Sequence, residues 1–155
     1  MPSPHKASDV SCAMTSVSMG DIRSIIDFER FDPWSCHRPL CAEDVRSAQS
    51  FLDFAERGTL FDTYDYNYHV RRTAMLVQEM DSWTNGHQEH PIHIDLSVLS
   101  CVPNRGWPVP DGNHRLFAAH ITDQPVVSAL VTGTPEQVER WLPRSAWSFR
   151  SDQTA

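Results

Sequence analysis

The sequence predicts an α+β domain, and three observations support this. Residues 92–96 alternate between apolar and polar side chains, as in a strand with one buried face. Residues 125–133 form a β-branched apolar run bounded by proline and glycine, which is typical of a more buried strand. Several other segments carry apolar residues at helical spacing, so we expect helices around these strands.

The first part of the chain divides into a polar start and a helical region. Residues 1–20 are rich in serine, proline and small polar residues, and we expect a disordered tail there. Order should begin near Asp21. With 155 residues in all, we expect one domain over 21–150, which is large enough to form a core without disulfides.

Three helical segments are predicted before the first strand. Residues 22–29 carry isoleucines at helical spacing, and Asp32-Pro33 closes that segment. Residues 42–57 place their apolar side chains on one face, and Gly58 follows as a C-terminal cap. Residues 68–80 form the third candidate.

The most informative stretch lies between the two strands and begins Asp111-Gly112-Asn113-His114-Arg115. Gly112 allows a tight turn, and the unpaired amides of a helix starting there carry the positive end of its dipole. Arg115 adds donors suited to phosphate oxygens, and His114 can donate a hydrogen bond or relay a proton. The alternative is an ordinary turn, a solvated arginine and a satisfied histidine, with no ligand.

The chain after the second strand predicts a last helix. Thr134 is a capping residue, Pro135 suits the first helical position, and Gln137 completes a capping box. The helix should run to about Leu142, because Pro143 cannot continue it.

The central motif resembles that of a known superfamily. Residues 112–118 match the Gly-x-x-Arg-x-x-Ala phosphate-binding signature of the ParB/sulfiredoxin superfamily, and residues 111–115 resemble the Asp-Gly-x-His-Arg form of its small-molecule kinase branch. The resemblance covers residues 71–142, about half the chain. It implies a small mixed β-sheet with packed helices, which binds a nucleotide.

Differences between this sequence and individual branches of the superfamily argue against some of their functions. Sulfiredoxin chemistry needs a cysteine just before the His-Arg pair, where this chain has Asn113. ParB partition proteins carry a helix-turn-helix domain after the nucleotide domain, and only about a dozen residues follow Leu142. The net charge of −7 also argues against sequence-specific DNA binding, which needs clustered positive charge.

We therefore expect a protein that binds a nucleoside triphosphate, ATP or CTP, with Mg²⁺, and hydrolyses it or transfers its phosphate to a small-molecule or protein acceptor. Gly112, Asn113, His114 and Arg115 would bind the phosphates, Asp111 would hold the metal, and Asp111, His114 and Arg115 would be catalytic. Two alternatives stay open: a non-enzymatic accessory or inhibitor module of plasmid or phage type, and a metal-dependent ParB-like nuclease.

Other residue types could complete such a site. Arg71 and Arg72 could contact the phosphates or could be ordinary exposed helix charges. The candidates for activating an acceptor or water are carboxylates: Glu79, Asp81, Glu89, Asp95 and Asp111. The candidates for stacking on a base are aromatic and could equally be packing residues: Tyr64, Tyr66, Tyr68 and Trp107.

Two further clusters could bind metal. Cys36, His37 and Cys41 lie close in sequence but lack a second pair at zinc-site spacing, so free thiols are expected. His87, His90 and His93 recur every third residue, a spacing that does not converge on an extended strand, and a polar strand face is the preferred interpretation. No segment approaches the roughly 20 apolar residues needed to cross a bilayer, and residues 1–20 lack the apolar central region of a signal peptide, so we expect a cytoplasmic protein.

Overall fold

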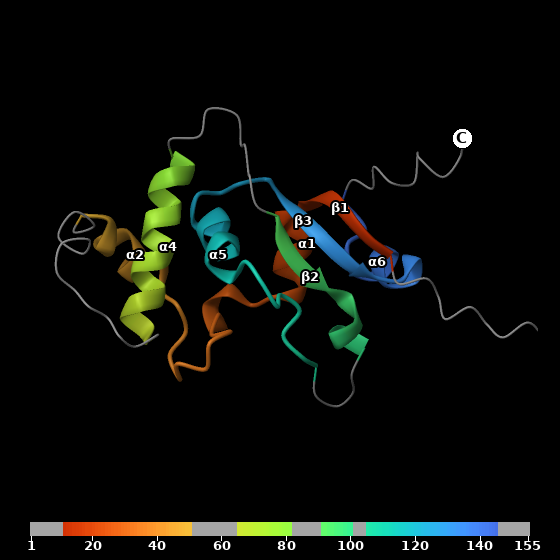
Figure 1. Ribbon diagram of the computed structural model, residues 1–155, viewed down its shortest axis with the longest axis horizontal. Coiled ribbons are helices and arrows are strands. Elements are labelled where there is room, and N and C mark those ends of the chain that lie inside the picture. The colour runs from red at the N-terminus through yellow and green to blue at the C-terminus, as the bar shows by residue number, and fades with distance from the viewer. Residues whose placement is uncertain (1–10, 51–64, 82–90, 101–104, 146–155) are drawn as a thin grey trace, which may run out of the picture. The chain divides into compact units, whose positions relative to one another are not determined.

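A computed structural model describes residues 11–50, 65–81, 91–100 and 105–145 (Figure 1). The chain is α+β, as expected. It divides into two compact units, each built from separate parts of the sequence. The sheet unit comprises Met1–Ile25, Gln88–Gly112 and Pro125–Ala155, and the helical unit comprises Ile26–His87 and Asn113–Gln124. The single domain expected over 21–150 stays a prediction.

The sheet unit contains a three-stranded mixed sheet in the order β1-β3-β2. β1 (Ser11–Ser18) runs antiparallel to β3 (Val126–Gly133), and β2 (Ile92–Asp95) runs parallel to β3. The central strand is β3, the β-branched run, because a strand flanked on both sides needs apolar side chains most. The two strands expected from the sequence are therefore confirmed.

One face of this sheet forms the apolar core of the unit. Its side chains alternate with half-exposed ones, which is the period of two that the sequence displays. The buried members are Val17, Ile92, Ile94, Val127, Ala129 and Val131. His93 and Thr132 belong to the opposite face, where His93 Nε2 lies 2.9 Å from Thr132 Oγ1.

β1 corrects the expected N-terminal boundary. It lies within the residues 1–20 that were interpreted as a disordered tail, and it pairs with β3 along its whole length, from Ser11 opposite Gly133 to Ser18 opposite Val126. Small residues dominate β1, so its own sequence carries little strand signal, and the pairing with the apolar β3 supplies the stabilisation. Residues 1–10 lie outside the described part.

Short helices complete the sheet unit. α1 (Met19–Ile25) follows β1 directly, a 3₁₀ helix (Leu96–Ser100) follows β2, and α6 (Pro135–Trp141) follows β3. Thr134 Oγ1 accepts a hydrogen bond from the Gln137 amide while the Gln137 side chain accepts one from the Thr134 amide. The predicted capping box and last helix are thus confirmed.

The helical unit is built around α4 (Tyr66–Asp81), which packs against α2 (Ala42–Gln49) and α5 (Asn113–Ile121) (Figure 1). A 3₁₀ helix (Phe28–Arg30) precedes them. The buried apolar side chains include Phe28, Phe31, Val45, Val70, Ala74, Val77, Leu116 and Phe117. The predicted helix over 68–80 is confirmed, and the one predicted over 42–57 is confirmed as far as Gln49. Residues 51–57 and Gly58 lie outside the described part.

The helix expected over 22–29 is instead divided between α1 and the 3₁₀ helix. Asp27 separates the two, because its extended backbone and side chain cap the second: Asp27 Oδ1 accepts a hydrogen bond from the Glu29 amide. Nowhere in the described ranges does a helix have both the length and the apolar character needed to cross a membrane.

Candidate functional site

The turn at Gly112 belongs to the sheet unit and has a left-handed backbone, with φ of 93°. The preceding segment runs beside β2, where the His93 amide donates to the Asp111 carbonyl at 2.9 Å and the Asp95 amide donates to the Pro108 carbonyl at 2.7 Å. A β-carbon at Gly112 would lie 2.7 Å from Ile92 Cγ2. Both the conformation and the close approach therefore require glycine.

α5 begins at Asn113, the next residue, and belongs to the helical unit. Its buried residues are Leu116, Phe117, Ala118 and Ala119, and these anchor the helix. Ile121, expected on the same buried face, is half-buried. The first turn contains His114 and Arg115 and lies at the positive end of the helix dipole. The strand, glycine turn and helix thus follow one another as the sequence indicates.

His114 lies in a cluster of rings within the helical unit. Its Nε2 is 2.8 Å from Nδ1 of His69 on α4. Trp34 stacks on both imidazoles, with ring centroids 3.9 Å from His69 and 4.6 Å from His114. Tyr68 contacts both imidazoles edge-on. Together, these contacts restrain the orientation of the His114 ring.

The surroundings of His114 keep its imidazole neutral. Burial, followed by the charges of His69, Arg72 and Arg115, lowers the pKa of His114 to about 4. At neutral pH the ring therefore offers one N–H donor and one acceptor nitrogen. His114 cannot contribute a positive charge to an anion site, but Arg72 and Arg115 can.

The structure separates the predicted binding residues between two units joined by the chain. Asn113, His114 and Arg115 lie in the helical unit, and Asp111 and Gly112 lie at the end of the sheet unit's segment. Of the additional candidates, Arg72 and Tyr68 accompany His114. Arg71 instead extends along its own helix, where its Nε donates to the Asn67 carbonyl at 3.4 Å.

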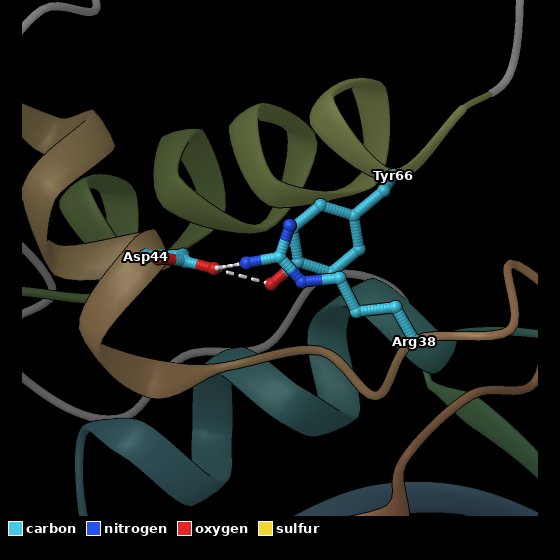
Figure 2. A network of polar contacts seen from close by, with 3 residues as sticks. All are labelled: Arg38, Asp44 and Tyr66. Carbon is cyan, nitrogen blue, oxygen red and sulfur yellow. Dashed lines mark hydrogen bonds and ion pairs between the residues drawn. The ribbon is translucent and has the colours of Figure 1, made fainter.

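Tyr66 has a different neighbourhood from Tyr68. Its hydroxyl donates to Asp44 Oδ2, which also accepts from Arg38 Nη2 at 3.0 Å, and the Arg38 guanidinium lies over the Tyr66 ring (Figure 2). These three residues connect α2, α4 and the loop that precedes α2, so Tyr66 is a packing residue. Trp107 is half-buried in the sheet unit. Tyr64 and Glu89 and the Asp81 side chain lie outside the described part.

Sequence reasoning missed Trp34 and His69. A weak signal existed for His69, because it stands three residues before Arg72 on a helix and so shares its face. Trp34 follows Pro33 in an irregular loop, and its position depends entirely on tertiary packing.

The residues that the sequence offers as metal ligands do not form a metal-binding group in the described part of the structure. Within the described ranges, no group of three or more histidine, cysteine, aspartate or glutamate side chains is placed to hold a metal ion. Asp95 Oδ1 accepts from the Ser97 amide and hydroxyl, and Cys36 and Cys41 are free thiols.

Asp111 is exposed beside the turn. A single carboxylate there suits Mg²⁺, which proteins often hold through one or two carboxylates together with substrate phosphates. His87 and His90 lie outside the described part.

We compared the chain with protein-family models, with curated proteins and with solved structures, and none of the three comparisons found a match. The motif, the elements beside it and the contacts of His114 are therefore the features that bear on function.

Proposed function

We propose that the chain binds a nucleoside triphosphate, ATP or CTP, through residues 111–115, as in the ParB/sulfiredoxin superfamily that the motif resembles. The observation that carries this proposal is the first turn of α5, where Arg115 follows a His114 ring that is held against His69 and Trp34. Arg72 and Arg115 add positive charge, which helps to keep this imidazole neutral.

A phosphate chain suits such surroundings because it carries several negative charges and accepts many hydrogen bonds. The first-turn amides of α5 supply donors and the positive end of the helix dipole. Arg115 supplies a planar fork of donors, and Arg72 supplies a second positive charge on α4. His114 supplies one uncharged donor.

Mg²⁺ is part of the proposal, and Asp111 is the residue that would hold it. When bound, the ion would neutralise charge on the phosphate oxygens. The protein's own contribution would be to orient the terminal phosphate and stabilise the charge that develops during transfer, through Arg115 and the helix amides. The acceptor would be water or a small molecule or protein hydroxyl.

Calorimetric titration of ATP, CTP and GTP, each with Mg²⁺, tests this function. We expect micromolar binding of one nucleotide to the full chain and its loss in Arg115→Ala. Arg30→Ala is the matched control, because Arg30 also belongs to the helical unit but its side chain is 87% exposed. Equal affinity in a folded Arg115→Ala protein would exclude the proposed site. If no nucleotide binds the wild type, an interaction module becomes the better account.

Release of phosphate from the bound nucleotide separates turnover from simple binding. We expect Asp111→Asn to bind the nucleotide less tightly in the presence of Mg²⁺ than the wild type does, and to lose any turnover. An Asp111→Asn variant with unchanged Mg²⁺ dependence would show that this carboxylate does not hold the ion.

A further inference from the structure

His69 and His114 form a histidine pair whose geometry limits how protons can be arranged. His69 is buried, with 4% of its surface exposed, and its Nδ1 lies 2.8 Å from His114 Nε2. Two ring nitrogens at this distance need one proton between them, because two lone pairs or two N–H groups would repel. When both rings are neutral, one donates and the other accepts.

The donor in this pair determines what the rest of His114 can do. If His69 donates, His114 Nε2 accepts and its proton lies on Nδ1, which is then a donor. If His114 donates, its Nδ1 carries a lone pair and can only accept. A phosphate oxygen is an acceptor, so only the first arrangement allows the neutral ring to bind it.

Ring stacking also restrains the two imidazoles. Trp34 stacks on both rings, with interplanar angles of 7° to His69 and 19° to His114. On α4, Thr73 Oγ1 donates to the His69 carbonyl at 2.8 Å. The charges that act on His114 come from the same two helices, from His69 and Arg72 on α4 and from Arg115 on α5, and all three favour the neutral His114 ring.

We propose that His69 is a positioning residue, which donates its Nδ1–H to His114 Nε2 and thereby holds His114 in the tautomer that is protonated on Nδ1. The role of that Nδ1–H as a donor to phosphate rests on the proposed function. The choice of His69 as the donor rests on it too, because a phosphate would accept from that Nδ1–H, but the tautomer can be measured in the protein without any ligand.

Three variants separate the hydrogen bond from the ring stacking. His69→Phe keeps a flat ring for Trp34 and removes the donor. His69→Asn keeps an amide near the position of Nδ1 and removes the ring. His120→Phe is the control, because His120 on α5 also stacks on an aromatic ring, that of Phe28, at 4.0 Å between centroids.

Nitrogen-15 NMR of the imidazole rings gives the tautomer of His114 at neutral pH. In the wild type we expect protonation on Nδ1, in His69→Asn and His120→Phe the same, and in His69→Phe a mixture of both tautomers. Protonation of His114 on Nε2 in the wild type would overturn the proposal, and this result needs no variant to fold. An unchanged tautomer in folded His69→Phe would also overturn it.

Binding of Mg²⁺-ATP, Mg²⁺-CTP and inorganic phosphate then measures the consequence. We expect roughly tenfold weaker binding in His69→Phe, because a hydrogen bond to a charged group is lost, and recovery in His69→Asn. Equal weakening in His69→Asn and His69→Phe would assign His69 a packing role and overturn the proposal. Absence of binding to the wild type would contradict the proposed function, while the tautomer result would still decide the role of His69.

Discussion

A β-carbon on Gly112 would lie 2.9 Å from Cα of Ile92, so the turn before α5 packs directly on the backbone of β2. The glycine of the motif is therefore needed for packing within the sheet unit, independently of any ligand. The conformation of Gly112 therefore does not by itself indicate a ligand.

Gly112→Ala should lower the free energy of unfolding by about 2 kcal/mol or more, because the left-handed backbone and the contact with Ile92 are both unfavourable for alanine. Urea unfolding measures this. Gly20→Ala is the control, since its β-carbon would meet nothing closer than 3.4 Å and alanine favours helix α1. Equal stability of Gly112→Ala and wild type would contradict the packing argument.

Acid should destabilise the fold through His114. The pKa of His114 is about 4 in the folded chain, below the value of 6.5 for an unperturbed histidine, so the unfolded chain binds more protons between these values. Stability from the neutral ring is present above pH 6.5 and is lost as the pH falls towards 4, with a slope of up to about 1.4 kcal/mol per pH unit.

Comparison with His114→Gln isolates this contribution, because glutamine does not titrate. The difference in unfolding free energy between the wild type and this variant should change with pH in that window and stay constant above it. A constant difference from pH 4 to pH 8 would show that His114 is not held neutral.

The phenol of Tyr66 should ionise only at high pH. Burial and the hydrogen bond to Asp44 raise the pKa of Tyr66 to about 12, and ultraviolet absorbance titration should show this. Stability from the neutral phenol is present below pH 10 and is lost between pH 10 and 12.

Tyr66→Phe should lower the free energy of unfolding by about 1 kcal/mol at pH 7. In Asp44→Asn the pKa of Tyr66 should fall, and an unchanged value would contradict the contact in Figure 2.

Asp21→Ala should destabilise the sheet unit by about 3 kcal/mol. Asp21 is 3% exposed, and its Oδ2 accepts from the Arg144 amide and the Ser145 hydroxyl, both at 2.8 Å. Removing the carboxylate leaves these donors unsatisfied. Asp27→Ala makes the same change at an exposed carboxylate and should cost less than about 1 kcal/mol. Similar losses of unfolding free energy in both variants would show that the buried hydrogen bonds of Asp21 do not stabilise the sheet unit.

The elements that the sequence predicts well are those with local signals. The Thr134–Gln137 capping box, the helical period of α4 and the alternation in β2 each depend on neighbouring residues. β1 could not be predicted in the same way, because its small residues become a strand only by pairing with β3. Locally coded elements were therefore predictable, and pairing-dependent ones were not.

The same distinction applies to the candidate site. The turn at Gly112 and the start of α5 follow from the order of residues, since glycine, a polar first turn and an apolar helix face are adjacent. The contact between His69 and His114 joins residues 45 positions apart, and Trp34 reaches both rings from a loop. Such contacts arise from tertiary packing, so a single sequence carries no direct signal for them.

The central claim is that phosphates bind at the first turn of α5, and an amide NMR titration tests it most directly. Addition of Mg²⁺-ATP or Mg²⁺-CTP to the labelled chain should shift the amides of Asn113, His114 and Arg115 most strongly, with saturation. Shifts confined to other segments, or no saturable shift with either nucleotide, would contradict the claim.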